Sequence, residues 1–92
     1  MIKKKRIFKT NGEKLEEIVK KVDSMGFLTG QEVHSDEQFQ RYLLPQGLLV
    51  TINKQRGWYA PIITIEFFDS EPNILPELIK MLNEFSCWEV TE

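Results

Sequence analysis

The sequence predicts an α+β domain in which two helices cover one face of an open antiparallel sheet. Two stretches, 7–27 and 67–87, carry apolar residues at the same i, i+3, i+4, i+7 and i+10 spacing when one is laid over the other. That spacing is typical of a helix with one buried face, and a short apolar run precedes it in both stretches. The chain between them alternates apolar and polar residues between turn-forming prolines and glycines, which is typical of paired strands.

The first strand is predicted within residues 2–9, and the first helix follows over about 13–25. Thr10 or Asn11 is expected to cap the start of that helix, because their side-chain oxygens can accept from its first backbone N–H groups. The predicted buried face of the helix consists of five apolar residues: Leu15, Ile18, Val19, Val22 and Met25.

The end of this helix is expected at Gly26, which suits a left-handed C-terminal cap. Phe27 is then expected to fold back onto the core. Residues 28–37 are expected to form a connection, with strand character at 32–34. Whether 31–37 forms a further strand is left open by the sequence.

The middle of the chain predicts three strands, at 38–44, 48–53 and 58–68, with turn residues at 45–47 and a short hairpin loop at 54–57. Proline at position 61 lacks a backbone donor, so the first half of the third strand is expected at an edge or a bulge. In the second of these strands Leu48, Val50 and Ile52 share one face. In the third, Ile63, Ile65 and Phe67 are expected to face the core, with Phe68 facing away.

The second helix is predicted near 74–85, with Ser70 or Asn73 as its cap and Pro76 tolerated only in its first turn. Residues 87–91 are expected to close the chain as a last strand. Taken in order, these elements favour a ferredoxin-like plait, βαββαβ, with room for one extra strand and with both helices on one face of the sheet. The 92 residues, 1–92, are sufficient for a single domain.

Composition excludes several classes of function. The chain has no apolar run of membrane-spanning length, and no apolar stretch follows its basic N-terminus, so a cleaved signal is not expected. The single cysteine, Cys87, lies between Phe85 and Trp88 and is expected to be buried, and a cytoplasmic location is expected. His34 has no second ligand or base near it, so we expect no metal, no cofactor and no enzymatic activity.

Charge is distributed unevenly and suggests one alternative function. Residues 1–30 hold eight Lys or Arg and four Asp or Glu, whereas the rest of the chain is acidic. A nucleic-acid-binding domain could use this basic third, because lysine and arginine neutralise phosphates. The residues expected to contact phosphates are Lys3, Lys4, Lys5, Arg6, Lys9, Lys14 and Lys21. A patch that unites them would favour nucleic acid, and their dispersal would favour a protein partner.

Two short segments resemble the RNA-recognition motif family, whose domains share the predicted plait and carry aromatic residues on the first and third strands. Residues 7–11 (IFKTN) resemble the first-strand motif and residues 56–59 (RGWY) the start of the third-strand motif. The resemblance implies base stacking, but it covers fewer than ten residues. It departs at Ala60 and Pro61, where an aromatic and a β-branched residue are expected.

A protein partner is the function that the sequence favours. Aromatic residues beside arginine on an exposed element are typical of protein-binding hot spots, and four residues of the predicted hairpin fit that description: Lys54, Arg56, Trp58 and Tyr59. We expect a non-enzymatic module of the inhibitor, immunity or regulatory-subunit type, which binds another protein through a sheet edge or this hairpin. Pairing of edge strands would also allow a homodimer, and a regulatory plait that holds a small metabolite is a further alternative.

Overall fold

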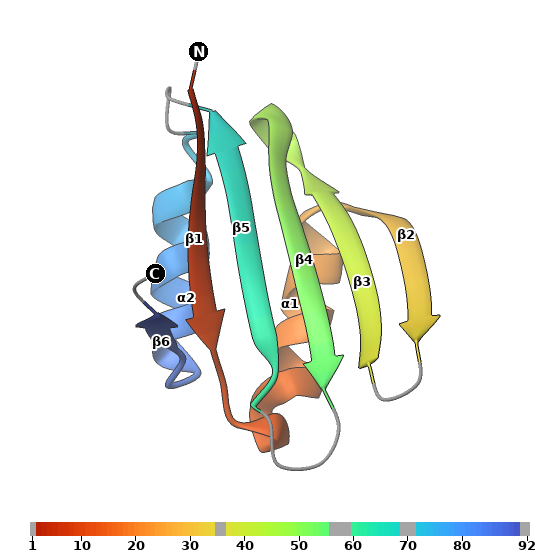
Figure 1. Cartoon of the computed structure of the whole chain (residues 1–92). Helices are drawn as coiled ribbons and strands as arrows, with labels where there is room; N and C mark the ends of the chain where they lie inside the picture. The colour runs from red at the N-terminus through yellow and green to blue at the C-terminus, as the bar shows by residue number, and fades with distance from the viewer. Residues whose placement is uncertain (1, 35–36, 56–59, 69–71, 91–92) are drawn as a thin grey trace.

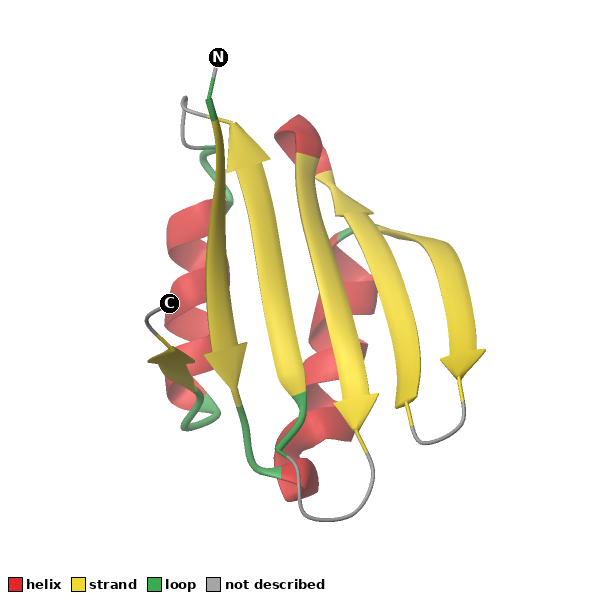
Figure 2. Ribbon diagram, in the orientation of Figure 1, coloured by secondary structure: helices red, strands yellow, loops and turns green. Residues whose placement is uncertain are grey.

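A six-stranded antiparallel sheet with two helices behind it forms the protein (Figures 1 and 2). The computed structural model describes residues 2–34, 37–55, 60–68 and 72–90. The elements in chain order are β1 (Lys3–Lys9), the 3₁₀ turn η1 (Gly12–Lys14), α1 (Leu15–Met25), β2 (Phe27–His34), β3 (Glu37–Leu44), the 3₁₀ turn η2 (Pro45–Gly47), β4 (Leu48–Gln55), β5 (Ile62–Phe68), α2 (Leu75–Glu84) and β6 (Trp88–Val90).

The strands lie in the order β2-β3-β4-β5-β1-β6, and every neighbouring pair is antiparallel. The α+β class, the open antiparallel sheet and the two helices are therefore as predicted. The chain places four successive strands between its helices, where the predicted plait with one extra strand has three. The strand that the sequence left open is β2, which spans most of the expected connection at 28–37.

Alternate residues of the sheet pack against both helices in one core. From β5 this core receives the residues that the sequence predicted, Ile63, Ile65 and Phe67, and β1 adds Phe8. The face of β4 that enters the core is the one formed by Leu48, Val50 and Ile52. The helices contribute Leu15, Ile18, Val22, Leu75, Leu78, Met81 and Leu82, while Val19 and Met25 are half-buried beside them. Both helices therefore cover the same face of the sheet, as Figure 1 shows.

The two ends of α1 differ in how well the sequence predicted them. The Asn11 side chain accepts a hydrogen bond of 2.9 Å from the Glu13 backbone N–H, which caps the 3₁₀ turn that leads into the helix. Gly26 is not left-handed, since its φ of −161° and ψ of −155° are extended. Its real constraint is space, because a Cβ there would collide with the Leu43 carbonyl oxygen. Phe27, predicted to fold onto the core, is 78 % exposed at the start of β2.

The second helix begins without a side-chain cap and ends in a tight left-handed turn. The N-cap position is Ile74, with no side-chain capping bond, so the predicted cap at Asn73 is wrong, and Ser70 lies outside the described residues. The Asn73 backbone N–H donates to Gln46 Oε1 at 2.7 Å. At the other end Ser86 has a φ of 61°, and the Cys87 N–H donates to the Leu82 carbonyl at 3.0 Å. This Schellman-type ending turns the chain back toward β6.

The Arg6–Glu89 pair holds β6 against β1 and predicts a pH-dependent contribution to stability. Arg6 donates two hydrogen bonds to the Glu89 carboxylate, of 2.8 and 2.6 Å, and these bonds lower the pKa of Glu89 below its usual value of 4.5. A carboxyl with a lowered folded-state pKa stabilises the fold above its unfolded pKa, and this contribution is lost as the pH falls through the folded-state value.

We therefore expect Glu89→Gln to lower the free energy of unfolding by about 0.5–1 kcal/mol at neutral pH, a modest effect because the pair is partly exposed. Urea denaturation should show this difference shrinking below pH 4.5. The matched control is Glu84→Gln on the exposed side of α2, which should change stability little at any pH. A pH-independent loss in Glu89→Gln would mean that the ion pair is not its cause.

Candidate functional site

Among the described residues, no helix or loop covers the sheet face opposite α1 and α2 (Figure 1). Cross-strand partners share a face, so the register from β1 to β3 places Lys5, Glu66, Leu49 and Leu43 in one row across this side. Along each strand these residues alternate with the buried ones. We call this side of the sheet the open face, and its residues are exposed or half-buried.

Four large apolar side chains gather at one end of the open face. Phe27 of β2 lies opposite Leu43 of β3, which in turn lies opposite Leu49 of β4. Phe68 ends β5 and lines the same hollow as Leu43 and Leu49. The exposed fractions are 78 % for Phe27, 43 % for Leu43 and 49 % for Phe68, whereas Leu49 is half-buried. We call Phe27, Leu43, Leu49 and Phe68 the apolar corner.

Two shallow pockets meet at Leu43 and extend this corner. The larger has a volume of about 610 Å³ and runs past Met25, Phe27 and Pro45 to η2. The smaller, of about 340 Å³, lies over Leu49 and Phe68. Together the pockets make a hollowed apolar surface that crosses the ends of β2, β3, β4 and β5. A surface of this shape can receive apolar side chains from another molecule.

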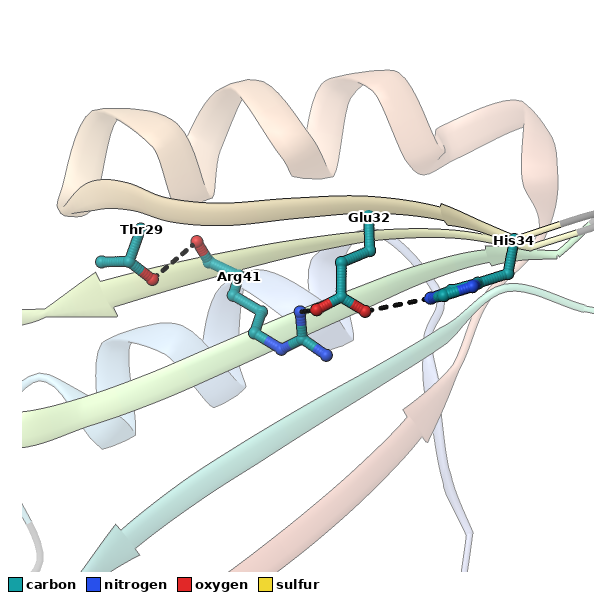
Figure 3. A network of polar contacts seen from close by, with 4 residues as sticks. All are labelled: Thr29, Glu32, His34 and Arg41. Atoms are coloured by element: carbon teal, nitrogen blue, oxygen red, sulfur yellow. Dashed lines mark hydrogen bonds and ion pairs between the residues drawn. The ribbon is translucent and has the colours of Figure 1, made fainter.

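Several charged groups on the open face are paired with one another. Lys3 forms an ion pair with Glu66 beside the apolar corner. On β2 and β3 the Arg41 guanidinium donates to Glu32 at 2.9 Å, and the same carboxylate lies 3.1 Å from His34 Nε2 (Figure 3). These contacts with His34 and Arg41 lower the pKa of the Glu32 carboxyl below its usual 4.5. The open face therefore combines the exposed apolar groups of the corner with these ion-paired charges.

The hairpin cluster predicted from the sequence is only partly described. Lys54 lies near the end of β4, where its side chain is 20 % exposed and its Nζ is 3.8 Å from Glu16 Oε1 of α1. Arg56, Trp58 and Tyr59 lie outside the described residues. Because the odd-numbered residues of β4 face the open side, Lys54 belongs to the opposite side of the sheet from the apolar corner.

The seven basic residues predicted to contact phosphates do not form one patch. Lys3, Lys5 and Lys9 point to the open face, since their cross-strand partners do so. Lys4 and Arg6 alternate with them, and Arg6 is tied to Glu89. The remaining two belong to the helical layer behind the sheet, in η1 and α1: Lys14 and Lys21. Positive charge is therefore divided between the two sides of the molecule.

The metal-binding and nucleophilic side chains among the described residues include Cys87 and His34. None of the described residues form a group of three or more His, Cys, Asp and Glu side chains suited to holding a metal ion. Cys87 is buried as predicted, and burial raises the pKa of its thiol, which disfavours the reactive thiolate. His34 is exposed at the end of β2. Within the described ranges, no helix is long and apolar enough to cross a membrane.

Sequence reasoning missed most of the apolar corner. The alternation along β5 correctly placed Phe68 away from the core. Phe27 and Leu43 were missed because their proximity depends on the register of β2, a strand that the sequence left open. No protein-family model matches the chain, and neither the curated proteins nor the solved structures gave a significant match.

Proposed function

We propose that this protein is a small, non-enzymatic protein-binding module that docks a partner protein on its apolar corner. The observation that supports this function best is the row of Phe27, Leu43 and Leu49 on an uncovered sheet face, with Phe68 beside it. Exposed aromatic and aliphatic side chains that form one hollowed surface are characteristic of interaction sites rather than of ordinary monomer surface.

The surroundings of the corner fit the anatomy of a protein interface. Such interfaces place an apolar centre inside a polar rim, and charged groups are depleted at the centre. Here the Lys3–Glu66 pair lies at the β5 side of the corner, and the Arg41–Glu32 pair lies further along β3 and β2. Because these charges neutralise one another, the corner fits a partner whose matching surface is apolar and close to neutral.

Nucleic acid fits this surface less well. The basic residues are dispersed over both sides of the sheet. The lysines and the arginine on the open face share that face with Glu32, Glu37 and Glu66. A polyanion needs uncompensated positive charge along its track. Phe8, the aromatic of the segment that resembles an RNA-recognition motif, is 2 % exposed and points into the core. Binding of a partner protein is therefore the favoured function. The module would be of the inhibitor, immunity or regulatory-subunit type and would act in the cytoplasm.

A photo-crosslinking experiment tests this proposal. The photoreactive residue p-benzoylphenylalanine is placed at Leu43 in the apolar corner, and the chain is irradiated in its native cells. We expect Leu43 to give a discrete protein adduct, because the residue replaces an apolar side chain at the centre of the proposed interface. The captured protein is then purified and its binding to the unmodified chain is measured directly.

The matched control places the same photoreactive residue at Lys20, which is exposed on α1 in the helical layer. The proposal predicts no equivalent adduct from this position. The same adduct from both positions, or capture of RNA from Leu43 instead of protein, would contradict docking of a protein at the corner.

A further inference from the structure

β2 is a long edge strand that carries few of the usual protections against pairing. It has eight residues, Phe27–His34, and all but Gly30 are exposed. Natural edge strands are commonly guarded by lysine, by proline or by being very short. The sequence of β2 (FLTGQEVH) contains neither residue, whereas the opposite edge, β6, has only three residues. Its protective features are the charged Glu32 and a bulge at Thr29, whose hydroxyl donates to the Arg41 carbonyl at 3.2 Å.

Apolar side chains of β2 are also exposed on the helix side of the sheet. Leu28 is 48 % exposed and Val33 is 66 % exposed, although both point to the side that the helices cover elsewhere. Figure 1 shows the reason: α1 lies behind β3 and β4, and β2 extends past the helical layer. Both faces and the outer edge of β2 are therefore exposed to solvent. The exposed side chains include three apolar ones, Phe27, Leu28 and Val33.

We propose that β2 pairs antiparallel with β2 of a second copy of this chain, with the two-fold axis at Gln31. In this register Gln31 lies opposite the partner's Gln31. Because Thr29 is a bulged residue without a cross-strand partner, Leu28 then lies opposite the partner's Val33. The two sheets would join into one continuous sheet, and the interface would be isologous, with each contact made twice. The four exposed apolar side chains of Leu28 and Val33 would then form two apolar pairs on the helix side, one on each side of the Gln31 pair.

The alternation along β2 supports this register. Phe27, Gly30, Glu32 and His34 point to the open face, while Leu28, Gln31 and Val33 point to the helix side, because the bulge at Thr29 shifts the alternation by one residue. The Gln31 axis pairs residues of the same face along the whole strand, with Phe27 opposite the partner's His34. It also places Glu32 opposite the partner's Gly30.

Neighbouring registers lack these properties. An axis at Glu32 would place two carboxylates directly opposite each other, which is destabilising. An axis at Gly30 would place Glu32 opposite the partner's Phe27 and leave Val33 beyond the end of the partner's β2, without a pairing residue. A second copy is therefore the occupant that the pattern of β2 fits along its full length. This inference does not depend on the proposed function, because the dimer leaves the Leu49–Phe68 part of each open face uncovered.

Sedimentation equilibrium tests the dimer with two lysine variants. At about 100 µM the unmodified chain should sediment mainly as a dimer, at twice its mass of 10.8 kDa. Val33→Lys should weaken dimerisation by about tenfold or more, because both symmetric Leu28–Val33 contacts are lost and lysine guards the edge. Phe68→Lys is the matched control, since it adds the same charge to an exposed position three strands away and should leave the dimer intact.

Disulfide trapping tests the register. Gln31→Cys would place two thiols directly opposite each other, within the 4.5–5.5 Å Cα separation of an antiparallel pair, so oxidation should link the two chains. Glu32→Cys is the control, because it lies opposite the partner's Gly30 and its own copy is beyond the usual ~7 Å limit for a disulfide. Monomeric unmodified chain, a Val33→Lys dimer of unchanged affinity, or equal crosslinking of both cysteine variants would overturn the proposal.

Discussion

Replacing Phe67 with alanine is expected to lower the free energy of unfolding by about 3–5 kcal/mol, whereas Phe68→Ala should change it by less than about 1 kcal/mol. The two phenylalanines are neighbours on β5, so backbone propensity and chain position are nearly the same for both. Phe67 is 4 % exposed and packs in the core, while Phe68 is 49 % exposed on the open face. Only the first substitution removes a large side chain from a closely packed interior.

Urea denaturation of both variants checks this prediction. Linear extrapolation to zero urea gives the free energy of unfolding of each variant in water. An unchanged slope shows that each variant exposes the same amount of surface on unfolding. Losses of similar size in the two variants would mean that the open face is covered in the folded protein. That result would contradict the assignment of Phe68 to an exposed surface.

The second large effect is expected at Gly26, where α1 passes into β2. A Cβ at this position would collide with the Leu43 carbonyl oxygen and lie 2.9 Å from Leu44 Cδ1. Because a backbone atom cannot move aside as a flexible side chain does, Gly26→Ala should push α1 and β3 apart. We expect a loss of about 2–3 kcal/mol, in the range of overpacked interiors.

Gly12→Ala is the matched control for this substitution. A Cβ at Gly12 meets no atom within 4 Å, so alanine there should leave stability nearly unchanged. Thermal unfolding followed by circular dichroism measures both variants. If Gly26→Ala were as stable as Gly12→Ala, the close approach of the helix end to β3 would be wrong.

The elements with strong apolar periodicity were predictable from the sequence. Helices α1 and α2 follow the spacing of their buried residues, and β4 and β5 follow strict alternation because one face is buried and the other is not. β2 lacks that signal for a physical reason. Since water reaches both of its faces, its residues have no apolar side to repeat, and its strand state depends on pairing with β3.

Gly26 and Ser86 show a second limit of sequence reasoning. A glycine after a helix predicts a left-handed cap, but Gly26 is extended and is glycine because Leu43 approaches it closely. The left-handed residue occurs after α2 instead. It is Ser86, and because it is not a glycine the sequence does not indicate its conformation. A glycine can be required because its backbone adopts a left-handed conformation or because another group approaches it closely. Only the packing of the neighbouring elements shows which of these reasons applies. The proximity of Phe27 and Leu43 in the apolar corner could not be predicted either, because it depends on how β2 pairs with β3.

The affinity of the protein captured at Leu43 for the unmodified chain and for Phe68→Ala tests the central proposal most directly. Phe68→Ala is expected to fold normally, so a loss of binding would not reflect unfolding. Isothermal titration calorimetry should show affinity about thirtyfold weaker, equivalent to about 2 kcal/mol, because an aromatic anchor of the interface is lost. Unchanged affinity would contradict docking on the apolar corner.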